Sequence, residues 1–195
     1  MESEPLHDPA NESFLLTNQS LRELFDELLS RNFEENLHCS DREIVKYLAN
    51  LLTDFSRAEK LYAIRNASGK TLEDVGEMLL ESNPLFEAPS FDREREVRKH
   101  IGDFTLFFVG LFPEAVNRWR LRRQRLDSLL DYVRTGKESY FIVSEFNLFE
   151  YKDDAPLFKK MSEQFEACVF GLNLVKRDLE QMQQESYVRA RKYLV

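Results

Sequence analysis

Residues that bend or cross-link a chain are scarce in this sequence, which holds six glycines, six prolines and two cysteines in 195 residues. The shortage of glycine indicates few tight turns. Cys39 and Cys168 are too few for the disulfide framework of a small secreted domain. The opening Met1–Pro5 is acidic and has neither the basic nor the apolar region of a secretory signal. We therefore expect reduced thiols and a cytoplasmic protein.

Long apolar runs and an excess of positive charge are also missing. A membrane-spanning helix needs about 20 apolar residues, and no stretch of this sequence reaches that length, so we expect no membrane span. The formal net charge is −8. An acidic surface repels phosphate backbones, which argues against a nucleic-acid partner. A chain of this length fits a single domain whose core needs no metal or disulfide.

Phenylalanine, by contrast, is abundant, with 16 residues. In the stretch around residue 104, Val97, Ile101, Phe104 and Phe108 recur at steps of four and three, the spacing of one helical face. Other apolar residues fill the remaining faces as far as Phe112. A helix that is hydrophobic all round needs a dry environment. The sequence therefore predicts a central buried helix over residues 92–112.

Capping signals followed by apolar faces of helical period predict further helices. In each signal a serine or threonine precedes an acid by three residues, so that both side chains satisfy backbone N–H groups. The signals are Ser20 with Glu23, Ser40 with Glu43, and Thr71 with Asp74, while Ser90 or Asp92 precedes the central helix.

Residues 118–133 continue the helical pattern, and Gly136 is the predicted C-terminal stop. Tyr140–Val143 is the one strand-like stretch. Because a lone strand makes no sheet, we predict a helix here too, with Tyr140, Val143 and Phe146 facing inward.

The C-terminal segment has the most regular pattern in the chain. From Phe158 to Met182 apolar residues alternate steps of three and four, which predicts one long helix continuing towards Tyr193. The apolar stripe is wide as far as Val175, which favours packing within the domain. Beyond Val175 the stripe narrows, and this end has the pattern of a segment that pairs with a second chain. Gly171 would admit a close neighbour.

Together these patterns predict an all-α fold: a single helical bundle of about seven helices, with a central Phe-rich buried helix and a long C-terminal helix. We expect residues 1–12 to form a disordered acidic tail and residues 13–195 to form the domain. Residues 84–91 contain two prolines and are predicted to be a connecting loop.

Glu96, His100 and Asp103 stand at spacings that place all three on one side of the central helix. Such a trio suits a metal ion or acid–base chemistry, but a di-iron bundle needs Glu-x-x-His pairs that this sequence lacks. Ser68–Thr71 resembles the end of a phosphate-binding loop, yet Ile64 stands where the motif requires glycine. We therefore predict no metal and no cofactor, and expect the trio to be buried polar residues, with Asp103 paired to an arginine or to helix amides.

An arginine-rich patch is the most conspicuous charged feature. Five arginines and the only tryptophan occur within eight residues, namely Arg118, Trp119, Arg120, Arg122, Arg123 and Arg125. The patch suits an acidic partner. With a net charge of −8, however, the composition favours a solvated helix face that balances the acidic surplus of the chain.

These features favour a non-enzymatic interaction or regulatory module that binds a protein partner, or forms a homodimer, through the arginine patch or the C-terminal helix. The alternative is a bundle that binds an apolar small ligand in a Phe-lined pocket. A cavity of several hundred Å³ (roughly the size of known ligand pockets) beside Phe104, Phe107 or Phe108 would favour that alternative. A metal-dependent enzyme at Glu96 and its neighbours is the third hypothesis.

Overall fold

The computed structural model describes residues 9–38, 41–83, 90–123 and 129–194. Within these ranges the chain forms ten α-helices, one short 3-10 helix and no strand, which confirms the all-α class. The elements are α1 (Pro9–Leu37), α2 (Arg42–Phe55), α3 (Ala58–Leu61), α4 (Val75–Glu81), α5 (Phe91–Leu111), α6 (Pro113–Arg123), α7 (Leu129–Glu145), η1 (Phe149–Tyr151), α8 (Ala155–Glu163), α9 (Phe165–Gln181) and α10 (Glu185–Leu194).

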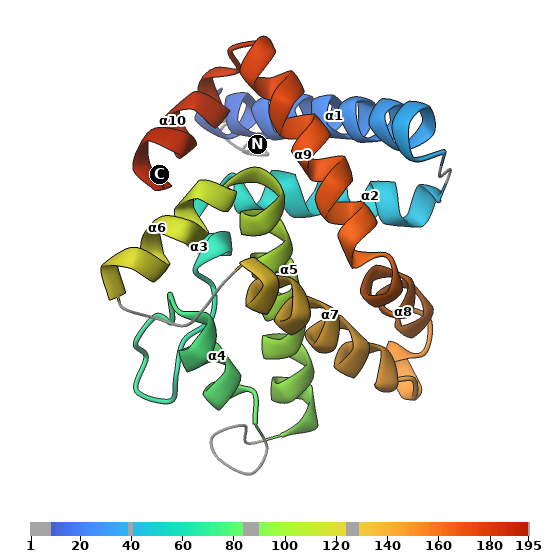
Figure 1. The fold of residues 1–195 in the computed structure, drawn as a ribbon, viewed down its shortest axis with the longest axis vertical. Helices are drawn as coiled ribbons and strands as arrows, with labels where there is room; N and C mark the ends of the chain where they lie inside the picture. Colours follow the sequence, from blue (N-terminus) through green and yellow to red (C-terminus); the bar gives the residue numbers. More distant parts are fainter. Residues whose placement is uncertain (1–8, 39–40, 84–89, 124–128, 195) are drawn as a thin grey trace, which may run out of the picture.

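Helix α5 runs through the middle of the molecule and is the predicted central helix (Figure 1). Ser90 caps its start, where the hydroxyl oxygen accepts a hydrogen bond from the backbone N–H of Arg93 at 3.1 Å. Every residue from His100 to Leu111 is buried, and α7 and α9 make the most extensive contacts with α5. The prediction of a dry central helix is therefore confirmed.

Helices α1 and α2 lie side by side as an antiparallel pair, which α9 crosses (Figure 1). Helix α1 begins at Pro9, earlier than Ser20 and inside the segment predicted as a tail. Asp41 caps α2 by accepting from the N–H groups of Glu43 and Ile44. An aspartate next to the first helical residue fills the cap position as well as a serine does.

The prediction of one long C-terminal helix is wrong. The segment breaks into α8, α9 and α10, with Gln164 between the first two and a turn at residues 182–184 before the third. Gln183 has a φ of 50°, a left-handed backbone conformation that ends a helix. The apolar seam is nonetheless buried from Phe158 to Leu179. A bend of the chain around the core thus leaves the three-and-four pattern intact.

Gly136 does not end a helix, contrary to the prediction, because it lies in the middle of α7. A Cβ atom at Gly136 would come within 2.5 Å of Thr105 on α5 and within 2.4 Å of Phe165 on α9. The missing side chain allows three helices to approach closely. Gly171 admits a close neighbour, as predicted, since a Cβ atom there would lie 2.2 Å from the ring of Phe33.

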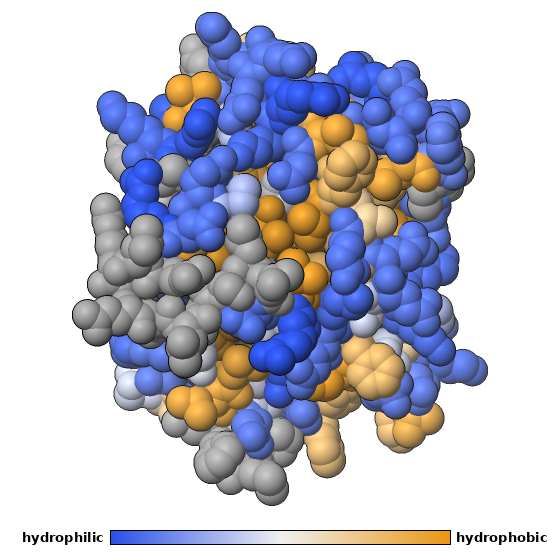
Figure 2. Space-filling view, in the orientation of Figure 1, coloured by the Kyte–Doolittle hydropathy of each residue, from blue (hydrophilic) through white to orange (hydrophobic). Residues whose placement is uncertain are grey.

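Most of the face drawn in Figure 2 is hydrophilic, and hydrophobic residues gather near its middle, over α5 and α9. No helix in the described ranges combines the length and the apolar character needed to cross a bilayer. Residues 1–8 of the predicted tail and residues 84–89 of the predicted connecting loop lie outside the described residues.

Candidate functional site

Only part of the arginine-rich patch belongs to the residues that the structure describes. Helix α6 carries its first part, and Arg118 is exposed. The side chains of Trp119, Arg120, Arg122 and Arg123 lie outside the described residues, as does Arg125. A binding role for this patch therefore stays a prediction.

The polar trio on α5 lines one small cavity. Glu96, His100 and Asp103 face a space of about 260 Å³ that is bordered also by Arg95 and Tyr151. Each member of the trio is engaged in its own bond. The prediction of three buried residues is wrong for Glu96, which is exposed and pairs with Arg93 at 2.9 Å. Among the described residues no three His, Cys, Asp or Glu side chains are clustered so as to hold a metal ion.

Asp103 is buried and fully engaged. Its Oδ1 accepts hydrogen bonds from the hydroxyls of Tyr47 at 2.5 Å and Tyr140 at 2.7 Å, and its Oδ2 pairs with Lys99 at 2.7 Å. The predicted pairing is thus confirmed, but the partner is a lysine rather than an arginine. Burial, together with the charge of Asp103, raises the pKa of both tyrosines well above the ordinary value. Both hydroxyls therefore stay protonated and donate.

His100 is also held by the fold. Its Nε2 lies 3.1 Å from the carbonyl oxygen of Leu61, and because a carbonyl can only accept, Nε2 carries a proton and donates it. Burial lowers the pKa of His100 below its ordinary value, more than the charge of Asp103 raises it. His100 is consequently a neutral residue that joins α5 to α3.

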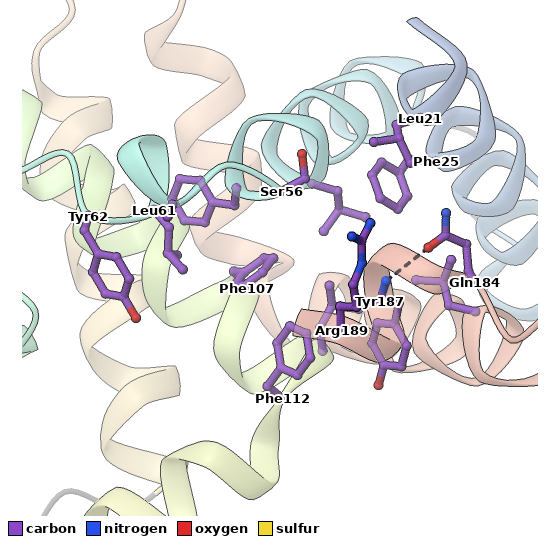
Figure 3. Close-up of a pocket in the computed structure, with 15 residues that line it drawn as sticks. Leu21, Phe25, Ser56, Leu61, Tyr62, Phe107, Phe112, Gln184, Tyr187 and Arg189 are labelled. Carbon is purple, nitrogen blue, oxygen red and sulfur yellow. Dashed lines mark hydrogen bonds between the residues drawn. The ribbon is translucent and has the colours of Figure 1, made fainter. Parts of the chain in front are cut away.

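A much larger cavity lies at the other end of α5 (Figure 3). This space, which we call the aromatic pocket, has a volume of about 670 Å³, within the range of small-molecule sites. It is open to solvent on one side. Its wall residues come from α1, α2, α3, α5, α9 and α10 and the turns beside them. They are Leu21, Phe25, Leu52, Phe55, Ser56, Ala58, Leu61, Tyr62, Phe107, Leu111, Phe112, Leu179, Gln184, Tyr187 and Arg189.

Packed aromatic rings form the floor of the pocket. Phe107 lies between Phe55 and Phe112, with ring centroids 5.4 Å from each. Each of these three rings is at least nine-tenths buried. Such rings hold their positions because they are packed from behind, which gives the pocket a preformed wall.

Helix α10 closes one side of the pocket through Tyr187, which stacks on Phe112 with centroids 5.5 Å apart. The turn at residues 182–184 sets this position, because Gln184 accepts a hydrogen bond from the N–H of Tyr187. Glu180 of α9 then binds the Tyr187 hydroxyl at 3.2 Å and Arg191 at 3.0 Å. Three polar interactions and one ring stack thus fix α10 against the core.

Polar groups are confined to the rim of the pocket. Figure 3 shows the guanidinium of Arg189 reaching from α10 into the space bordered by Ser56 and Phe107, with Gln184 nearby. Among the described residues, the lining contains no carboxylate, histidine or cysteine.

Of the three phenylalanines that the sequence predicted beside a ligand pocket, Phe107 alone lines this one. Phe104 and Phe108 are instead fully buried and packed on each other at 4.6 Å. Tyr187 and Arg189 were not predicted, because the heptad pattern gives no sign that the chain bends back over α5. Comparison with known protein families, with curated proteins and with solved structures found no match to this chain.

Proposed function

We propose that this protein binds an apolar small molecule in the aromatic pocket and performs no chemistry on it. The observation that carries the proposal is a cavity of about 670 Å³ walled largely by phenylalanine and leucine residues, several of which belong to the buried core. Burying apolar surface on such walls contributes about 25 cal/mol per Å². The described lining has no carboxylate, histidine or cysteine, side chains that commonly act in acid–base or nucleophilic catalysis, which supports binding rather than turnover.

The same reasoning disfavours an enzyme at the α5 trio. Glu96, His100 and Asp103 each have an internal partner that a reaction would have to displace. We therefore propose that these residues stabilise the fold.

The cytoplasmic location proposed from the cysteine content remains part of the proposal.

Filling the pocket tests the proposal. Ala58 is exposed and small, and it lines the pocket, so Ala58→Trp would occupy the cavity without removing a core side chain. We expect the neutral dye Nile red to bind the unmodified chain with a blue-shifted emission, and its affinity to fall at least about tenfold in Ala58→Trp. Ala67 is exposed and outside the pocket, so Ala67→Trp is the matched control and should bind like the parent. Equal binding by both variants would refute the pocket.

A second candidate is docking to a protein partner, as the composition first suggested. Leu148 and Phe149, which we call the tip, are 67% and 88% exposed, and Phe149 has a φ of 52° that is strained for a bulky residue. Tyr151 holds this conformation by donating to Asp92 at 2.9 Å, and Arg95 lies 4.0 Å above the Tyr151 ring. A rigidly presented apolar pair suits an interface hot spot.

The charge around the tip defines its partner. Exposed acids flank it, namely Glu145, Glu150, Asp153 and Asp154. We propose a protein with an apolar pocket and a basic rim. Photocrosslinking from position 149 would identify it, and the isolated partner should then lose affinity with Phe149→Ser and with added salt. An affinity insensitive to both would rule out the tip. The arginine patch and pairing through the C-terminal segment remain proposals of the same class.

A further inference from the structure

We infer that the ligand of the aromatic pocket is an amphipathic anion, with an apolar chain in the pocket and one negatively charged head group against Arg189. This inference rests on the proposed function and deepens it. It follows from the positive charge at the rim of the pocket, whereas the protein as a whole carries a net negative charge.

Arg189 is the charged residue of the described pocket lining, and it forms no ion pair with a described carboxylate. Of the described acids at this end of the molecule, Glu180 pairs with Arg191 at 3.0 Å, and Glu114 pairs with Lys176. The protein carries a net charge of −8, and a guanidinium that borders an apolar cavity without a partner among the described carboxylates is a group that can bind an anion.

Gln184 adds a second donor at the same rim. Its side-chain oxygen accepts the hydrogen bond from the N–H of Tyr187, which leaves the amide NH₂ as the group available to a ligand. The side chains of Arg189 and Gln184 can therefore both donate hydrogen bonds to a ligand. A carboxylate accepts from such donors, whereas an ammonium group would be repelled by the guanidinium.

The remaining walls define the rest of the ligand. Phe55, Leu61, Phe107 and Leu111 offer only hydrocarbon surface, so a polar or multiply charged molecule would lose its hydration there without compensation. A long-chain monocarboxylate satisfies both parts of the pocket. A phosphate-rich or sugar-like ligand would leave the apolar walls without an apolar partner.

The test compares three ligands with the same chain and different head groups: dodecanoate, dodecanol and dodecylamine. Binding to the full chain is measured by displacement of Nile red. We expect dodecanoate to bind about tenfold more tightly than dodecanol, since charge-assisted hydrogen bonds are stronger than neutral ones, and dodecylamine to bind most weakly. In Arg189→Gln the affinity for dodecanoate should fall about tenfold, and that for dodecanol far less.

Arg177→Gln is the matched control, because Arg177 is exposed on α9, outside the pocket lining, and its loss changes the net charge equally. This variant should keep the preference for dodecanoate. Equal affinities for dodecanoate and dodecanol in the unmodified chain would overturn the head-group inference and leave the pocket standing. A preference that survives Arg189→Gln would overturn the role of Arg189. If none of the three ligands binds, the proposed function itself fails.

Discussion

The Asp103 carboxylate joins three helices at one point, because its partners Tyr47 and Tyr140 belong to α2 and α7. Removing one donor leaves a buried charge less well satisfied, and hydrogen bonds to charged groups contribute about 1.5–3 kcal/mol. Tyr140→Phe should therefore lower the free energy of unfolding by about 2 kcal/mol, as measured by urea denaturation. Asp103→Asn should lower the free energy of unfolding by a similar amount. An unchanged free energy of unfolding in both variants would show that the hydrogen bonds to Asp103 do not stabilise the fold.

His100 should make stability depend on pH near neutrality. Burial lowers its pKa in the folded state, so the folded chain binds a proton only at lower pH than the unfolded chain, whose pKa is about 6.5. Stability is then complete above about pH 6.5 and is lost as the pH falls from there towards the folded pKa. Urea titrations across this window should show the decline, and His100→Gln should flatten it. A decline of equal slope in the variant would assign the effect to other groups.

At the scale of helices, the small residues decide how closely the elements pack. Replacing a helical glycine by alanine ordinarily stabilises a helix by about 1 kcal/mol. At Gly136, however, the new Cβ would overlap Phe165 and Thr105, and overpacking of this kind costs about 1–3 kcal/mol. We expect Gly136→Ala to lower the melting temperature, and the added substitution Phe165→Leu to recover part of the loss. A melting temperature raised by Gly136→Ala would contradict this packing.

Helix-scale prediction from sequence succeeded where the pattern reports burial directly. The all-apolar face of α5 is buried as predicted, and Tyr140 and Val143 face inward from α7. Phe146, predicted to face inward with them, follows the last residue of α7 and is only partly buried. Prediction failed where contacts between helices determine the local structure. Gly136 lies inside a helix, where its missing side chain leaves room for two neighbouring residues. The bend at Gln183 was missed because it leaves the apolar spacing of the chain unchanged.

For the whole molecule, the aromatic pocket exists because α10 turns back over the end of α5 instead of extending α9. The Phe content predicted an aromatic core, but not where packing would leave a space. That space depends on how the α1–α2 pair, α5 and α10 are placed relative to one another, and local sequence patterns carry no information about this arrangement.

Methyl-resolved NMR of the intact chain, with leucine methyl groups labelled and dodecanoate added stepwise, tests the binding pocket most directly. The leucines of the pocket are Leu21, Leu52, Leu61, Leu111 and Leu179, whereas Leu72 and Leu157 lie outside it. The account predicts saturable shifts concentrated on the five pocket leucines and nearly absent from the other two. Shifts spread evenly over all seven, or none at any ligand concentration, would contradict it.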